Sequence, residues 1–167
     1  FEGYVPADCN RELHILGGGG TVGVIESMHD KFKDIGPTTL KFIGTVTNEQ
    51  KQVINTKAMY RQNLTSFSGK ASMNTKVILS IGSSMDSGKT TSAAYLVRGL
   101  RKAGHFVAFI KLTGTVYTKD CDLNFDLGAN ITSDFGNLGF PSTYMCDEQE
   151  LLDLYESLLK GVLIVNP

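Results

Sequence analysis

The feature that most limits the possible folds is a glycine-bounded loop, residues 82–91, which reads Gly-Ser-Ser-Met-Asp-Ser-Gly-Lys-Thr-Thr. An unbroken apolar run, residues 77–81, leads into it, and such runs are typical of strands buried in a parallel sheet. An amphipathic stretch, residues 90–103, follows, and Gly104 stands where a helix would end. Residues 106–110 form a second apolar run. This order predicts a βαβ unit with a right-handed crossover.

The loop is typical of a phosphate-binding site, although its spacing is unusual. Five residues separate Gly82 from Gly88, one more than in the common pattern, and Ser83 stands where the first glycine of that pattern would be. Successive backbone N–H groups in such a loop form a concave anion site with the positive end of the following helix. The alternative is that Gly-Lys-Thr-Thr only begins a helix. The apolar run before the loop and the amphipathic stretch after it favour the phosphate site.

The residue types in the loop suit a nucleoside triphosphate with Mg²⁺. Gly88 lets the backbone come close to the phosphates, and Lys89 would reach the β- and γ-phosphates, where its charge offsets the charge that accumulates as the bond breaks. Thr90 would place its hydroxyl on Mg²⁺, and Thr91 would contact the α-phosphate. The residues predicted to bind the nucleotide are Ser84, Met85, Asp86, Ser87, Gly88, Lys89, Thr90 and Thr91.

The loop resembles that of the dethiobiotin synthetase and cobyrinic acid amidotransferase group of P-loop proteins, which is related to MinD. Members of that group also have five residues between the glycines and often an acidic residue at the position of Asp86. Ser84 stands where the MinD and ParA loops carry an additional lysine, which disfavours a regulatory dimer of that type. A lysine that closes the second strand faces the substrate and the γ-phosphate in this group. Lys111, in the sequence Ile-Lys-Leu-Thr-Gly at 110–114, matches that lysine, the alternative being a surface lysine that ends a strand.

The resemblance also implies a magnesium ligand in the polar stretch after this strand. The similar proteins place an aspartate there, and Asp120 and Asp122 are both available. Carboxylates are ligands that Mg²⁺ prefers, directly or through water. Asp120 is favoured, the length of the stretch leaves both open, and two solvated carboxylates are the alternative. The predicted catalytic residues are therefore Lys89, Lys111 and Asp120, and the predicted metal ligands are Thr90, Asp120 and Asp122.

Residues 128–144 are rich in glycine and in hydroxyl-bearing side chains. They either line a pocket for a small acceptor, with Asp134 or Ser142 facing it, or form a surface loop. Similar proteins have a third strand that ends in Asp or Glu, but no convincing strand of that kind is visible in the sequence. Cys121 has no histidine near it in sequence and is interpreted as a bystander rather than a nucleophile.

Two domains are predicted, residues 1–72 and residues 73–167. The first is a small β-rich domain with a linker, and the second is the nucleotide-binding domain, of which a segment is expected to be missing. The short strands expected in the first are residues 21–26, 40–46 and 52–56, after a run of four glycines at 17–20. Near the end of the chain, Asp147 and Glu150 resemble a capping box that opens a helix. The helix is expected to stop at Gly161, before an apolar strand at 162–165.

Composition excludes several classes of function. The formal charge is −1 with Lys and Arg scattered, whereas a nucleic-acid surface normally shows a basic stripe. The three cysteines form no Cys-x-x-Cys pair, so neither a zinc site nor a disulfide framework is indicated, and a reducing cytoplasm is the expected location. No apolar run approaches the ~20 residues that a membrane span requires.

The sequence therefore predicts an α/β P-loop domain with a mostly parallel sheet flanked by helices, next to a small β-rich N-terminal domain. By the resemblance, its activity is phosphoryl transfer or ATP-driven ligation on a small-molecule acceptor, with Mg²⁺ and with GTP as the other possible nucleotide. The resemblance further implies a homodimer. Two alternatives stay open: a nucleotide-switched binding module, and a P-loop protein that binds nucleotide without chemistry.

Overall fold

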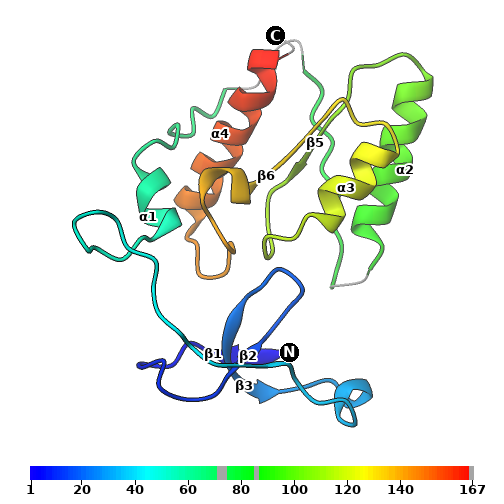
Figure 1. Cartoon of the computed structure of the whole chain (residues 1–167). Coiled ribbons are helices and arrows are strands. Elements are labelled where there is room, and N and C mark those ends of the chain that lie inside the picture. Colours follow the sequence, from blue (N-terminus) through cyan, green and yellow to red (C-terminus); the bar gives the residue numbers. More distant parts are fainter. Residues whose placement is uncertain (71–74, 85–86, 166–167) are drawn as a thin grey trace.

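Two separate sheets organise the chain, which a computed structural model describes over residues 1–70, 75–84 and 87–165 (Figure 1). Four strands form an antiparallel sheet in the order β1-β3-β2-β4. They are β1 (Glu2–Tyr4), β2 (Leu13–Ile15), β3 (Val22–Ser27) and β4 (Thr39–Leu40). The second sheet is a parallel pair, β5 (Ala108–Lys111) and β6 (Ile131–Asp134). The α/β class and the β-rich N-terminal part are as predicted.

The N-terminal sheet differs in detail from the prediction. Strand β3 confirms the strand expected at 21–26, but β1 and β2 were not expected. The strand expected at 40–46 does not form. The two-residue strand β4 stops at Leu40, and residues 41–46 are exposed. The strand expected at 52–56 is wrong: only an isolated antiparallel bridge joins Val53 to Thr47, and the short helix α1 (Thr56–Arg61) begins at Thr56. The side chain of Asn55 accepts a hydrogen bond from the N–H of Ala58 and caps this helix.

Helix α2 (Lys89–Lys102) follows the glycine-bounded loop as predicted. The apolar face expected from Ala93, Leu96, Val97, Leu100 and Ala103 is confirmed only in part. Val97 is buried, but the other buried residue is Ala94, and Leu96 is 43% exposed. Gly104 ends the helix with a φ of 86°, the left-handed conformation that glycine adopts without steric cost. The N–H of His105 then reaches back to the carbonyl of Leu100 at 3.1 Å and satisfies one of the last free carbonyls.

The predicted strand at 77–81 is absent from the structure, although all five of its residues are described. Its apolar side chains Val77, Ile78, Leu79 and Ile81 are between 60% and 78% exposed. An apolar run becomes a strand only where a neighbour completes its ladder of hydrogen bonds. Within the described residues, β5 pairs with β6 and with no other strand, so residues 77–81 find no such neighbour there.

The βαβ unit therefore lies one element later than predicted. It consists of β5, helix α3 (Lys119–Asp126) and β6, so that the expected polar loop at 119–122 is the start of a helix. Residues 131–134, expected to belong to a loop, form β6, and the 3₁₀ helix η2 (Phe135–Leu138) follows directly. Figure 1 shows α2 and α3 on one side of the parallel pair and α4 (Glu148–Val165) on the other.

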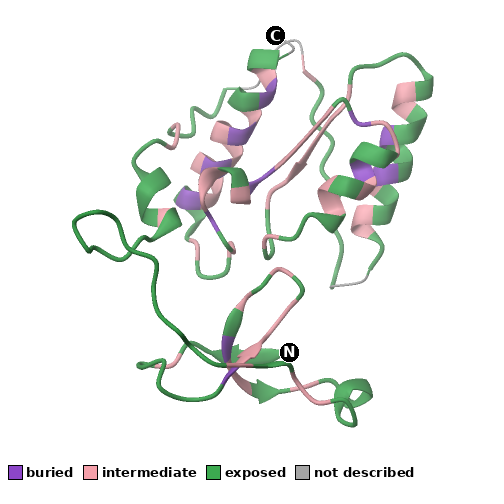
Figure 2. Ribbon diagram, in the orientation of Figure 1, coloured by how far each residue is buried: buried purple, intermediate pink, exposed green. Residues whose placement is uncertain are grey.

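Helix α4 overturns the expected strand at 162–165. It begins at the predicted cap, where the N–H of Glu150 donates to Asp147 Oδ1 at 2.7 Å, but it continues through Gly161 to Val165. A glycine inside a helix costs about 1 kcal/mol, which is too little to stop a helix whose apolar face continues. Leu154, Leu158 and Val162 are buried at intervals of four residues, and this helical spacing decides the conformation (Figure 2).

The main core lies between α4, η2 and the loops that follow the parallel strands. Its centre consists of Phe135, Phe140 and Leu154, all fully buried. Residues 65–68 also pack on α4: the N–H of Thr65 donates to Ser157 Oγ and that of Phe67 to Asp153 Oδ1, each at 2.8 Å. The domain boundary predicted near residue 72 lies outside the described residues. None of the helices in the described part of the chain is long and apolar enough to cross a membrane.

An ion pair fastens α1 to the first turn of α4. Lys57 Nζ lies 2.8 Å from Glu150 Oε2, and the Glu150 side chain is only 7% exposed. Burial alone would raise the pKa of Glu150. The hydrogen bonds from Lys57 and Cys146 and the charges of Lys57 and Arg61 outweigh burial, so the pKa lies below its usual value. The hydrogen bond to Glu150 raises the pKa of Lys57 in turn.

Replacing Glu150 with Gln should lower the free energy of unfolding at pH 7 by about 2 kcal/mol, because a mostly buried partner of Lys57 loses its charge. Since the folded-state pKa of Glu150 is lowered, its contribution is present above the unfolded-state pKa and is lost as pH falls through the folded-state pKa. The difference between wild type and Glu150→Gln should therefore shrink below about pH 4 in urea unfolding series. Glu148→Gln, an exposed position in the same helical turn, is the control. An equal effect of both substitutions would contradict the assigned ion pair.

Candidate functional site

The glycine-bounded loop presents the start of α2 without a side-chain cap. Gly88 is the N-cap residue, with φ 84° and ψ 9°, and no described side chain accepts a hydrogen bond from the first turn. The left-handed conformation of Gly88 suits a residue without a Cβ. Because the first N–H groups of a helix have no partner within the helix, they are available to an anion in front of it.

The side chain of Lys89 folds back over the loop. Its ammonium group donates to the carbonyl oxygen of Ser84 and, at 3.2 Å, to Ser87 Oγ. A Cβ on Gly82 would lie 2.2 Å from Ser87 Oγ and 2.8 Å from Lys89 Cγ, so the loop closes tightly over this glycine. The loop thus holds its own lysine with two oxygen atoms. Met85 and Asp86, two of the predicted nucleotide-binding residues, lie outside the described residues.

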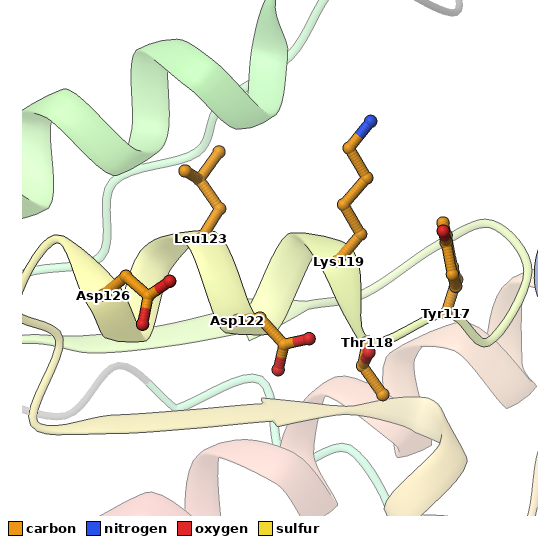
Figure 3. Close-up of a pocket in the computed structure, with 6 residues that line it drawn as sticks. All are labelled: Tyr117, Thr118, Lys119, Asp122, Leu123 and Asp126. Carbon is orange, nitrogen blue, oxygen red and sulfur yellow. The ribbon is translucent and has the colours of Figure 1, made fainter.

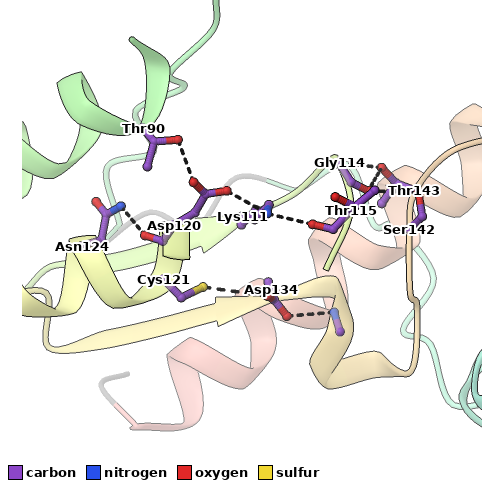
Figure 4. Close-up of polar contacts among 11 residues, drawn as sticks. Thr90, Lys111, Gly114, Thr115, Asp120, Cys121, Asn124, Asp134, Ser142 and Thr143 are labelled. Carbon is purple, nitrogen blue, oxygen red and sulfur yellow. Dashed lines mark hydrogen bonds and ion pairs between the residues drawn. The ribbon is translucent and has the colours of Figure 1, made fainter. Parts of the chain in front are cut away.

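Three of the predicted residues meet in front of α2, although they belong to three different elements (Figure 4). Lys111, the last residue of β5, places its Nζ 2.7 Å from Asp120 Oδ2. Thr90, in the first turn of α2, donates its hydroxyl to Asp120 Oδ1 at 3.1 Å. Asp120 itself lies in the first turn of α3. The structure therefore brings together Thr90, Lys111 and Asp120, three of the residues that the sequence predicts for the magnesium and catalytic site.

The ammonium group of Lys111 is held from several sides. Besides Asp120, it donates to the carbonyl oxygen of Thr115 at 2.8 Å and lies 5.9 Å from the centre of the Phe135 ring. The side chain of Lys111 is 12% exposed and that of Asp120 is 27% exposed. Lys111 is thus not the freely solvated surface lysine that the sequence left as an alternative.

Asp122 takes no part in this group. Residues two apart on a helix do not face the same way, and Asp122 lies on a different side of α3 from Asp120. It lines a surface hollow of about 360 Å³ (Figure 3). The other lining residues are Tyr117, Thr118, Lys119, Leu123 and Asp126. Of the two aspartates that the sequence left open, the structure places Asp120 beside Thr90.

Asp134 supplies the acidic strand end that the sequence did not reveal. It is the last residue of β6, paired in register with Lys111, and it is buried. Its Oδ1 accepts the N–H of Gly136 at 2.8 Å and caps η2. The β-branched pair Ile131 and Thr132 in front of a capping aspartate was the available sequence signal.

The loops beyond the two strands are tied to each other. The Ser142 hydroxyl donates to the carbonyl of Gly114 at 3.2 Å, and the N–H of Gly114 donates to Thr143 Oγ1 at 2.9 Å. Ser142, predicted as a possible pocket residue, therefore serves at least to join the loops after β5 and η2. Within the described ranges, no group of three His, Cys, Asp or Glu side chains could hold a metal ion by itself.

Comparisons of the chain with protein-family models, with curated proteins and with solved structures find no match. The resemblance to the dethiobiotin synthetase group therefore rests on residues 82–91 and 110–114 alone.

Cys121 lies beneath the site and donates its thiol hydrogen to Asp134 Oδ2 across 4.0 Å. Burial, followed by the negative charge of Asp134, raises the pKa of the Cys121 thiol to about 11. The thiolate is the nucleophilic form of cysteine, so this thiol is unreactive at neutral pH. The structure agrees with the interpretation of Cys121 as a bystander.

Iodoacetamide at pH 8 should alkylate Cys121 at a rate on the order of 100-fold lower than the rate for a free cysteine in solution, because so little of the Cys121 thiol is ionised. Exposed Cys9 of the same chain serves as the internal control and should react readily. Peptide mass spectrometry measures both rates in one sample. Equal rates for the two cysteines in the folded protein would show that Cys121 is not protected in this way.

Proposed function

We propose that the chain binds a nucleoside triphosphate with Mg²⁺ between the start of α2, the end of β5 and the start of α3, and that it drives phosphoryl transfer or ligation on a small-molecule acceptor. The observation that carries this proposal is the meeting of Thr90, Lys111 and Asp120 at the start of α2, which the N-cap residue Gly88 leaves without a side-chain cap of its own. Ligands of open parallel sheets bind beyond the carboxyl ends of the strands, which is where this group lies.

The phosphate groups would contact the first turn of α2 and Lys89. The two oxygen atoms that hold the Lys89 ammonium, the Ser84 carbonyl and the Ser87 hydroxyl, are the kind of acceptors that phosphate oxygens replace. To bind the phosphates, the Lys89 ammonium would have to break its contacts with both oxygen atoms. The loss of these contacts opposes nucleotide binding. The N–H groups of the first turn, for which the N-cap residue Gly88 has no side-chain acceptor, favour binding, since the positive end of the helix attracts an anion.

The donor set at Thr90 and Asp120 fits a magnesium ion. A hydroxyl and a carboxylate are hard oxygen ligands, and their hydrogen-bonded oxygens lie only 3.1 Å apart. Mg²⁺ is usually held by one or two carboxylates together with phosphate oxygens and water, so a larger protein cluster is not required. When bound, the ion would offset negative charge on the phosphates. Asp122 is too poorly placed to join this set.

Lys111 would act on the transferring group. Its ammonium is fixed before any ligand arrives, by Asp120 and by the Thr115 carbonyl, and such preorganised charge stabilises a transition state without reorganisation.

The acceptor would lie between the loops after β5 and η2, which Ser142 and Thr143 join to Gly114. Catalysis would then consist mainly of positioning and electrostatics. Turnover that depends on a small acceptor supports this activity, and turnover stimulated only by a protein partner supports a nucleotide switch instead.

Replacing Lys89 with Ala should weaken ATP binding at least tenfold, because the only lysine of the loop is lost. At an ATP concentration 100 times the wild-type Kd, bound ATP should raise the free energy of unfolding by about 2.7 kcal/mol in the wild type and by about 1.4 kcal/mol or less in Lys89→Ala. Thermal-shift titration with ATP, GTP and Mg²⁺ measures the difference. Lys102→Ala, an exposed position in the last turn of α2, is the matched control and should bind as wild type does. Identical shifts for Lys89→Ala and wild type would exclude the proposed phosphate site.

Replacing Asp120 with Asn should abolish most of the additional stabilisation that Mg²⁺ gives to bound ATP, because the carboxylate ligand is lost while size is kept. Binding of ATP in EDTA should change less. Asp122→Asn is the paired control, since it removes the same charge from the same helix outside the group. Melting temperatures without ligand are recorded first, because Asp120→Asn also leaves Lys111 without its carboxylate partner. A loss of the Mg²⁺ effect in Asp122→Asn alone would assign the metal to the other aspartate.

A further inference from the structure

The four-glycine run makes the turn of the hairpin between β2 and β3. The N–H of Leu16 donates to the Thr21 carbonyl at 2.7 Å, and the N–H of Gly20 donates to the Gly17 carbonyl at 3.0 Å. We refer to residues 17–20 as the glycine turn. Figure 1 shows this hairpin extending from the antiparallel sheet toward the loop that follows β5. The glycine turn thus points from one sheet to the other.

The glycine turn touches residues 116–117 with its backbone. A Cβ on Gly19 would lie 1.9 Å from the carbonyl oxygen of Val116, closer than real atoms approach. A Cβ on Gly18 would lie 3.3 Å from the ring of Tyr117, whereas one on Gly17 would meet no described atom within 4 Å. Only the absence of a side chain at Gly19 therefore allows the present contact with Val116.

Val116 connects this contact to the candidate site. Its side chain packs against the core at Gly136, and its N–H donates to the carbonyl of Pro141 at 2.9 Å. The preceding residue, Thr115, supplies the carbonyl that accepts from Lys111 Nζ. The Thr115 carbonyl and the Val116 carbonyl lie in successive peptide planes that meet at the Val116 Cα, and the Val116 N–H in the first plane is fixed to Pro141. A displacement of the Val116 carbonyl must therefore be absorbed at this one residue or be passed to the Thr115 carbonyl that Lys111 contacts.

We infer that the glycine turn is a positioning element of the site and that Gly19 is a positioning residue for Lys111. By resting on Val116, the turn fixes the Thr115 carbonyl and so holds the Lys111 ammonium against Asp120 and Thr90. The N-terminal sheet is then part of the nucleotide site rather than a separate module. The consequence for catalysis rests on the proposed function, whereas the consequence for the environment of Lys111 does not.

The test compares Gly19→Ala with Gly17→Ala, two identical substitutions two residues apart. The rate at which an N-hydroxysuccinimide ester of acetic acid acetylates Lys111 is measured without nucleotide by peptide mass spectrometry, with exposed Lys33 as internal standard. Gly19→Ala should accelerate the acetylation of Lys111 several-fold, because the displaced loop exposes the amine. Gly17→Ala should leave the rate unchanged. An unchanged rate in folded Gly19→Ala, judged by circular dichroism, would overturn the inference, as would equal acceleration in both variants.

A second measurement separates this inference from the proposed function. In turnover assays, Gly19→Ala should lower kcat several-fold while the KM for ATP stays within about twofold, since Lys89 and Thr90 are not displaced. A lower melting temperature with normal kcat and normal acetylation would show a merely structural role and would overturn the inference. If the wild type binds no nucleotide but Lys111 acetylation responds as expected, the proposed function fails and the positioning of Lys111 stands. If Gly19→Ala does not fold, Tyr117→Ala replaces it in both measurements, because the lost ring removes the other contact that holds the glycine turn beside residues 116–117. It should likewise accelerate the acetylation of Lys111, and an unchanged rate in that folded variant would overturn the inference.

Discussion

The ion pair between Lys111 and Asp120 is the interaction on which the arrangement of the site depends. Both groups are largely withdrawn from water, and an ammonium or a carboxylate in such a place is costly unless it is paired. Each charge therefore stabilises the other, and the ion pair holds the end of β5 against the start of α3. The hydroxyl of Thr90 donates to the same carboxylate and brings in the first turn of α2. One carboxylate thus orients three elements.

The parallel pair of strands explains why this point lies at an edge. The carboxyl ends of β5 and β6 meet there, with Lys111 and Asp134 in register. Asp134 is used to cap η2 and is shielded from solvent, while Lys111 faces the start of α2. The two strand ends consequently differ: the second anchors the buried core around Phe135, and the first places an ammonium group against Asp120, where the proposed ligand would bind.

Local sequence signals account for what could be predicted, and long-range packing accounts for what could not. Helix α2 and its end at Gly104 follow from apolar spacing and a single glycine, both of which act within a few residues. The apolar runs at 77–81 and 162–165 carry no such spacing, so they were assigned as strands although one is exposed and the other completes α4. Strand β6 was missed because its hydroxyl-rich sequence looks like a loop, and the contact between Lys57 and Glu150 joins residues 93 positions apart. Thr90 was predicted from the loop pattern and Lys111 and Asp120 by resemblance to a family, and in the structure Thr90 and Lys111 each contact Asp120.

The two lysines of the site differ in how they are held, and this difference gives them different parts in the proposed function. Lys89 is bound by the carbonyl and hydroxyl oxygens of its own loop, and under the proposed function it would exchange these for phosphate oxygens. That exchange affects affinity for the ground state and the transition state alike. Lys111 is fixed by a carboxylate, a backbone carbonyl and an aromatic ring, and none of these belongs to the glycine-bounded loop. A charge that does not move on binding is the kind that favours a transition state, and in the inference drawn above the contact of the glycine turn with Val116 would keep it in place.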